Sequence, residues 1–504
     1  MGKHCRKFSF FLGILIFTSA PVPAAANSGA RDNTSQPLYL QDNLYAAPGF
    51  SSHLPLITIE FKGKDEPGYV ALESNWLEDD WFNHSVISVY DNTNGGENTL
   101  QDEPSFTGIS KIQLLADWET ESREKHDYYI RLEDGNGQAK AHGLLGLPAN
   151  SEYWLVGSMY DKSLIRNYLG YTLAAEIMDN APKIHFCEVL LQTEEGPLYQ
   201  GVYLLIERTY ADTGVYIQRL AKEYGGIPLF TQYTQTVPGL GSLTVPFYEP
   251  EQPQEDLLQL ARDLSYIEGV LSSKDPHLFL QYKNLIDENS FVNYFIANEL
   301  LGNYDAALNT FYSYQNSKAH LLQAGPVWSF ERSLDNGVDT PMKVDEILLA
   351  QAPFFNDLIK SRDFVNALKG RYNELRAGPL SANHLMNLVD SAVEYLGPAQ
   401  ARDWARWEHI YQYDPLLALE PYTFEDDNRP SRLRQTESYT QEIIKLKYIL
   451  QEHSLQISEA IPRLYSLNNL MTAADNYQRN TVLFAGFFII FLVSIFLIKR
   501  YTLR

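Results

Sequence analysis

The sequence predicts an α+β protein: a mainly β N-terminal part at about 54–250, a mainly α part at about 251–465, and one C-terminal transmembrane helix. Three observations support this order. Residues 54–62 alternate between apolar and polar side chains, as a strand with one buried face does. Apolar residues recur at helical spacing from Leu257 onwards. Residues 481–498 form an uncharged apolar run that is long enough to cross a bilayer.

The composition is that of a folded, acidic protein. The chain has 504 residues, of which 45% are hydrophobic and 13% aromatic, and this supplies ample material for a core. Its net charge of −23 would repel a nucleic-acid backbone, so nucleic acid is not an expected partner. No His-Glu-x-x-His, Cys-x-x-Cys, Gly-x-Ser-x-Gly or Gly-x-x-x-x-Gly-Lys-Ser motif occurs. Zinc hydrolases, serine hydrolases and P-loop proteins are therefore without support.

The first 26 residues have the features of a secretory signal peptide. Basic residues precede an apolar stretch at 8–18, and small residues at 23–26 provide a cleavage site. The cysteines are Cys5, which lies in this leader, and Cys187. We therefore expect an exported chain without an intramolecular disulfide.

The other end has the pattern of a membrane anchor. Basic residues in the tail 499–504 follow the apolar run 481–498, and such residues favour the cytoplasmic side. The polar stretches 27–53 and 466–480 are expected to be a spacer and a stalk. We expect a single-pass membrane protein whose main domain, 54–465, is periplasmic or extracellular.

The β part should begin with the strand at 54–62. Residues 70–77 and 86–90 are expected to continue the sheet, and 184–191 with 201–207 should form a hairpin of core strands. A charged Glu207 at the end of so apolar a strand is costly to bury unless a cation pairs with it. The alternative is a Glu at the strand end that stays in water.

A helix is predicted to start near Leu164. Asp161 and Ser163 are suitable capping residues, and apolar side chains follow at helical spacing. Arg166 lies on the first turn. Its guanidinium could contact a phosphate or pair with an acidic neighbour, and the residues alone leave both open.

The second half of the chain is predicted to be mostly helical. Apolar residues recur every three or four positions within 257–271, 364–375 and 443–464. Trp404 and Trp407 extend this pattern. Aromatic residues at such spacing are usually part of a core.

The stretch 291–337 places polar residues directly after a predicted helix. An apolar helical pattern ends at Gly302, and Asn303, Asp305 and Asn309 follow in what we predict to be a loop. A short buried strand at 326–328 then leads to Glu331. A loop Asp with an Asn four residues later and an acidic residue after a strand is the layout of a phosphoryl-transfer site.

Several segments of the chain resemble the CotH family of spore-coat protein kinases. Trp328-Ser329-Phe330-Glu331-Arg332-Ser333 is similar to that family's Trp-Asp-Phe-Asp-Arg-Ser segment, and Asn303-Tyr304-Asp305 with Asn309 is similar to its catalytic loop. The segments 144–148, 154–167 and 199–207 match further family motifs. The resemblance covers roughly 54–464.

The resemblance implies an atypical bilobal kinase-like fold that uses ATP with Mg²⁺ or Mn²⁺. It assigns Asp305 to orient or deprotonate an acceptor hydroxyl, and Asn309 and Glu331 to hold the metal. It also assigns Lys125 and Arg166 to the phosphates, with Glu207 as the partner of Lys125. The implied partners are a nucleotide and a protein acceptor.

The chain departs from the family pattern at three places. Ser329 stands where the family has its metal-binding Asp, and Glu331 stands where it has a second Asp. The Gly-Ser turn expected before Lys125 is missing. Two hypotheses follow: a kinase that phosphorylates a protein hydroxyl, or a membrane-anchored pseudokinase that binds or assembles another surface protein.

Overall fold

The structure is a computed structural model. It describes residues 40–42, 44–61, 83–92, 95–115, 125–159, 161–179, 181–208, 214–220, 234–237, 241–244, 266–315, 321–336, 342, 346–352, 354–411 and 436–467. All of them belong to one compact unit, Leu38–Arg504. The predicted signal peptide and the predicted strand at 70–77 lie outside these residues.

The larger sheet has nine strands in the order β1-β2-β11-β10-β4-β5-β7-β8-β9. Their bounds are β1 Leu40–Gln41, β2 Tyr45–Ala46, β4 Leu56–Phe61, β5 Asn83–Tyr90, β7 Phe106–Leu115, β8 Asp127–Glu133, β9 Glu152–Val156, β10 Ile184–Thr193 and β11 Gly196–Glu207. β9 also pairs with β11, so the strands from β11 to β9 close on themselves. Their inward side chains, such as Ile57, Ile87 and Ile130, form a compact apolar core. A separate short pair joins β3 Ser51–Ser52 and β6 Asn98–Thr99.

Four sequence-predicted strands are found close to their expected positions. The strand at 54–62 is β4, the strand at 86–90 lies in β5, and the predicted hairpin is formed by β10 and β11. β10 pairs with β4 in parallel, with Glu188 opposite Leu56, and with β11 in antiparallel register.

A second sheet of five strands has the order β13-β14-β12-β15-β16. Its bounds are β12 Gly214–Leu220, β13 Thr234–Val237, β14 Gly241–Thr244, β15 Asn309–Gln315 and β16 Leu322–Ala324. β15 begins directly after α5 (Tyr304–Leu308). This sheet therefore fixes the chain immediately beyond Asp305.

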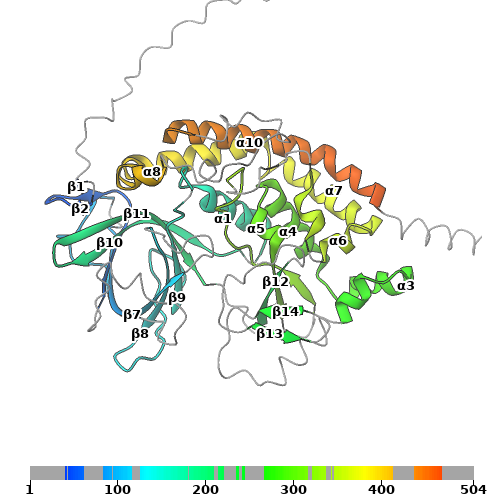
Figure 1. Ribbon diagram of the computed structural model, residues 1–504, viewed down its shortest axis with the longest axis horizontal. Coiled ribbons are helices and arrows are strands. Elements are labelled where there is room, and N and C mark those ends of the chain that lie inside the picture. Colours follow the sequence, from blue (N-terminus) through cyan, green and yellow to red (C-terminus); the bar gives the residue numbers. More distant parts are fainter. Residues whose placement is uncertain are drawn as a thin grey trace, which may run out of the picture. The chain divides into compact units, whose positions relative to one another are not determined.

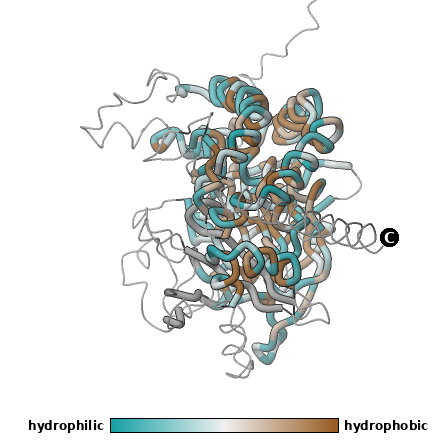
Figure 2. Tube along the Cα trace, turned by 90° about the vertical axis from the view of Figure 1, so that its right-hand side faces the viewer, coloured by the Kyte–Doolittle hydropathy of each residue, from teal (hydrophilic) through white to brown (hydrophobic). Residues whose placement is uncertain are grey.

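The helical part is built around α4 (Glu288–Leu300). Asp287 caps it by accepting hydrogen bonds from the Asn289 and Ser290 N–H groups, and nine of its residues are buried. It contacts α1 (Arg166–Ile177), α7 (Arg362–Arg376) and α10 (Tyr439–Ala460) (Figure 1). The shorter helices are α3 Pro276–Phe279, η3 Leu280–Asn284, η4 Leu348–Gln351, α6 Phe355–Leu358 and η6 Ile461–Leu467. Hydrophobic stretches of the trace gather in the interior, as Figure 2 shows.

The long helix α8 (Ala382–Tyr411) packs against β11. Arg402 binds the buried Glu188 carboxylate at 2.9 and 2.6 Å, and the Trp407 indole N–H donates to the Gln200 carbonyl at 2.9 Å. Gly201, which follows Gln200 in β11, has a φ of +114°, and a Cβ there would clash with the Asp403 carboxylate of α8. Glycine is needed at this position because the strand backbone approaches the helix so closely.

The predicted fold class and the single-pass membrane location need correction. Within the described ranges, no helix is both long enough and apolar enough to cross a bilayer. The long helices α8 and α10 instead carry charged residues, such as Asp390 and Lys447, along their exposed sides. The predicted span 481–498 and its flanking stalk and tail lie outside the described residues. The described architecture therefore contains strands and helices but no membrane helix.

Near the end of α4, Glu299 is a buried carboxylate with a side chain that is 1% exposed. It accepts hydrogen bonds from the N–H groups of Leu348 and Leu349 at 2.9 and 2.8 Å. His453 of α10 donates to the Glu299 backbone carbonyl at 2.6 Å. Burial raises the pKa of the Glu299 carboxyl to about 7, although the two N–H bonds act in the opposite direction.

This raised pKa predicts that the protein loses stability as the pH rises. Between the ordinary pKa of 4.5 and the folded-state pKa of about 7, the folded state keeps a proton that the unfolded state releases. We therefore expect Glu299 to reduce the free energy of unfolding by about 3 kcal/mol across this interval. Urea unfolding of the wild type and of Glu299→Gln, at about pH 5 and about pH 8, measures the difference. An identical pH dependence in both proteins would contradict the prediction.

Candidate functional site

Asp305 and Arg332, which come from the two motif segments, meet in the structure. Gly302 has a φ of +55° and ends the turn after α4, and Asp305 lies in the first turn of the short helix α5 instead of the predicted loop. The Arg332 guanidinium is 3.3 Å from Asp305 Oδ1 and lies over the Tyr304 ring at 5.1 Å. The Asp305 side chain is 16% exposed, so a second molecule can reach it.

The segment that carries Glu331 and Arg332 has an unusual backbone. Ser329, Leu334 and Asp335 have φ angles of +45°, +51° and +61°, which non-glycine residues seldom adopt. The Ser329 N–H is 3.2 Å from the Tyr171 hydroxyl, and the Ser329 carbonyl accepts from the Asn303 amide at 2.9 Å. These bonds place Ser329, which stands where the family has its metal-binding Asp, beside the Asp305 segment.

Asn303 has an acceptor that no described residue satisfies. The side chain is fully buried, and its amide nitrogen donates to Asn298 Oδ1 and to the Ser329 carbonyl, each at 2.9 Å. Its Oδ1 has no hydrogen-bond partner among the described residues. A buried oxygen in this state is suited to a cation or a donor from a ligand.

The described residues do not form a complete magnesium site. Glu331 is buried at 8% exposure, Asn309 is the first residue of β15, and its side chain lies outside what the structure describes. No three His, Cys, Asp or Glu side chains group closely enough to hold a metal within the described ranges. Ser329 offers only a neutral hydroxyl where an anionic ligand is expected. We therefore assign no step of a phosphoryl transfer to a metal.

Lys125 is fully buried and pairs with Asp403 of α8, not with Glu207. Its Nζ is 2.7 Å from Asp403 Oδ2, and both side chains have 0% exposure. The predicted Lys125–Glu207 pair is wrong because Lys125 packs beside the middle of β11, whereas Glu207 ends that strand. Lys125 lies beside the Tyr203 ring, at 5.5 Å, and four residues of extended strand, about 13 Å, separate Tyr203 from Glu207. Glu207 instead accepts the Lys183 N–H at 2.8 Å.

Asp403 is the partner of Lys125, and the sequence motifs did not indicate it. Besides Lys125, it accepts the Val202 N–H and the Tyr411 hydroxyl, each at 2.7 Å. It lies 278 residues from Lys125 in the chain. Its sequence signal is a charged residue directly before Trp404 in an otherwise core-like helix.

Arg166, which could contact a phosphate or pair with an acidic neighbour, is bonded within the protein. Its Nε donates to the Ser333 carbonyl at 2.9 Å. One terminal nitrogen donates to Asp161 at 2.6 Å and to Ser163 at 3.2 Å, and the other donates to Glu442 at 2.7 Å and to the Leu334 carbonyl at 3.3 Å. A guanidinium has five N–H donors, and all five are used. The structural alternative that the sequence left open is the one observed.

The charges around Arg166 are strongly coupled. Burial alone would raise the pKa of the Glu442 carboxyl, but the charges of Arg166 and Lys445 and a hydrogen bond from Thr436 lower it to about 2. Glu442 is therefore ionised throughout the physiological range. The ion pair joins α10 to the first turn of α1.

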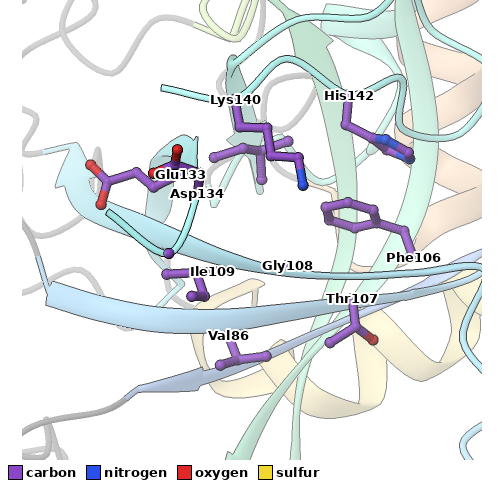
Figure 3. A pocket seen from close by; sticks show the side chains of 11 residues that line it. Val86, Phe106, Thr107, Gly108, Ile109, Glu133, Asp134, Lys140 and His142 are labelled. Carbon is purple, nitrogen blue, oxygen red and sulfur yellow. The ribbon is translucent and has the colours of Figure 1, made fainter. Parts of the chain in front are cut away.

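A cavity of about 360 Å³ lies at the far end of β8 and does not include any of the predicted site residues. Glu133, Asp134, Lys140, His142 and Phe106 line it, and Figure 3 shows the Lys140 ammonium pointing toward the Phe106 ring. β8 separates this cavity from Lys125 by about 20 Å. It is therefore not a candidate for the phosphoryl-transfer site.

Asp305 and Arg332, which come from two of the motif segments, lie together in the structure. Residues 117–451, about two thirds of the chain, match the CotH kinase protein family, so the chain belongs to this family. No curated protein matches the chain. The matched range contains all the predicted site residues as well as Asp403 and Glu442.

Proposed function

We propose that this chain is an atypical protein kinase that transfers the γ-phosphate of ATP to a hydroxyl group of a protein. The observation that carries the proposal is the meeting of Asp305 and Arg332, which are 3.3 Å apart although they come from separate family motifs. A partly exposed carboxylate held by an arginine can accept a hydrogen bond from an incoming hydroxyl and align its oxygen for attack. Membership of the CotH kinase family supports this assignment.

In this proposal the residues act mainly by positioning. Asp305 orients the acceptor hydroxyl and accepts its proton as the bond to phosphorus forms. Arg332 keeps the carboxylate in place through its ion pair and its stacking on Tyr304. ATP, when bound, supplies the phosphoryl group and a good leaving group. The family resemblance assigns Lys125 to the phosphates, and Asp403 holds its ammonium.

A second candidate function is that of a pseudokinase that binds a protein partner. The residues that the resemblance assigns to the nucleotide favour it. Arg166 has no N–H left for a phosphate, and Lys125 is fully enclosed with its carboxylate partner. Ser329 replaces the family's anionic metal ligand. The two candidates therefore differ in whether this site takes a nucleotide.

Calorimetric titration of MgATP and MnATP into the full chain distinguishes the candidates. We expect metal-dependent binding that becomes about tenfold tighter in Ser329→Asp, because the carboxylate restores an anionic ligand. Asp tolerates the positive φ of Ser329 better than most residues do. Ser329→Asn is the matched control, since it tolerates the same φ but adds no charge.

The contradicting results are equally specific. If the wild type and Ser329→Asp both bind neither nucleotide and remain folded, the kinase proposal fails and the pseudokinase is the better account. If Asn strengthens binding as much as Asp does, the gain comes from the backbone and not from a metal ligand. Transfer of labelled γ-phosphate to the chain itself and to Ser- and Thr-containing peptides then tests the activity directly.

A further inference from the structure

The segment 329–335 needs support from outside itself because its backbone is strained. Three of its seven residues, Ser329, Leu334 and Asp335, have positive φ angles. Such backbone conformations are costly and persist only where the surroundings hold them. Arg332, which contacts Asp305, lies between the strained positions. The place of Arg332 therefore depends on whatever fixes this segment.

The first turns of α1 supply most of that support. Asn167 Oδ1 accepts the Phe330 N–H at 2.6 Å, and the Tyr171 hydroxyl contacts the Ser329 N–H. The Phe330 ring lies so close to Gly170 that a Cβ there would clash with it, and it meets the Tyr171 ring edge-on at 5.5 Å. These contacts fix the beginning of the segment.

Arg166 fixes the end of the segment. Its guanidinium donates to the Ser333 and Leu334 carbonyls, the two residues that follow Arg332. The same guanidinium is held in place by the carboxylates of Asp161 and Glu442 at 2.6 and 2.7 Å. Glu442 in turn accepts the Thr436 hydroxyl at 2.6 Å. Arg166 thus joins the segment to α10, which contributes no residue to the Asp305–Arg332 pair.

We propose that Arg166 is a positioning residue that holds the 329–335 segment so that Arg332 meets Asp305, and that Glu442 of α10 is the counter-ion that fixes Arg166. The proposal rests on the proposed kinase function for its effect on rate, but its structural part stands without it. It replaces the phosphate contact expected for Arg166. It also makes α10 a remote determinant of the catalytic geometry.

The test uses the full chain with two variants and one matched control. Arg166→Lys removes the bonds to the two carbonyls and keeps a positive charge. Glu442→Gln removes the counter-ion charge with little change in shape, and it serves if the Arg166 variant fails to fold. Arg402→Lys is the control, because Arg402 is another buried arginine paired with a carboxylate, Glu188, but it does not touch the segment.

Hydrogen exchange and kinetics give separate readouts. We expect exchange at the Ser329, Phe330 and Leu334 amides to become about tenfold faster or more in both variants, and to stay unchanged at these amides in the control. We expect kcat for phosphoryl transfer to fall about 100-fold while the KM for ATP changes less than about threefold. The variants shift the Asp305–Arg332 pair without removing either residue, so the chemical step slows while nucleotide binding is unchanged.

Two results would overturn the proposal. A raised KM for ATP with unchanged kcat in Arg166→Lys would indicate that Arg166 contacts a phosphate of ATP. Unchanged exchange in the segment, or equal acceleration in the Arg402→Lys control, would show that Arg166 does not position it. If the wild type transfers no phosphate, the kinase proposal fails, and the exchange measurements still decide whether Arg166 holds the segment.

Discussion

The Asp305→Ala variant is expected to lose phosphoryl transfer by a factor of about 10³ or more while it keeps its fold. In the proposed reaction Asp305 aligns the acceptor hydroxyl, and removal of an aligning base costs about 10²–10⁴ in rate. The folded state loses the ion pair with Arg332, in which the Arg332 and Asp305 side chains are 11% and 16% exposed. Partly exposed pairs of this kind are typically worth about 1 kcal/mol or less.

The measurement is the initial rate of γ-phosphate transfer together with the urea midpoint of the same protein. Asp357→Ala is the matched control, because Asp357 is also a partly exposed acid, at 20%, with a cation partner in Lys360. The control should keep its rate and show a similar small loss of stability. Transfer that survives in Asp305→Ala would mean that another group aligns the acceptor, and the site assignment would be wrong.

Local features of the fold could be predicted because their causes lie close together in the sequence. Alternating apolar residues produced β4, and the capping residues near 161–163 predicted where α1 begins: Asp161 Oδ2 accepts the Arg166 N–H at 2.9 Å. Gly302 ends the helical pattern because it can adopt the positive φ that the turn requires. In each case a few neighbouring residues contain the physical reason.

The partners of the buried charges could not be predicted, because they are set by tertiary packing. Lys125 and Asp403 are 278 residues apart, and Arg166 and Glu442 are 276 residues apart. Sequence reasoning supplied Glu207 for Lys125 by analogy with other kinases, but the register of β11 places Glu207 too far along the strand. A charged residue in an apolar pattern indicates that a partner exists without saying which one.

The same separation in sequence left the role of Arg166 undecided. Its position after a capping motif was compatible with a phosphate ligand at a helix start and with an ion pair. Only the structure brings Asp161, Glu442 and two backbone carbonyls to its five donors. Counting the donors then decides between the two alternatives.

Asp403→Ala is expected to destabilise the protein by about 3–5 kcal/mol, because it leaves the Lys125 ammonium buried without a counter-ion. Both side chains are completely enclosed, so water cannot replace the lost carboxylate. The variant also removes the acceptor of the Val202 N–H and of the Tyr411 hydroxyl. The urea-unfolding free energy measures the loss. Asp363→Ala is the comparison, because its pair with Lys283 is 46% and 41% exposed and should cost about 1 kcal/mol or less.

A double-mutant cycle shows whether the buried charge is the cause. The double variant Lys125→Met with Asp403→Asn removes both charges and keeps an acceptor for the Val202 N–H. We expect its loss of unfolding free energy to be smaller, by about 2 kcal/mol or more, than the sum of the losses in the two single variants. Additive effects would mean that Asp403 acts mainly through its bonds to β11 and α8 and not through Lys125. In that case Lys125 would be held by its packing against Tyr203 and Gly157. Strong coupling would instead identify α8 as the element that fixes the Lys125 ammonium.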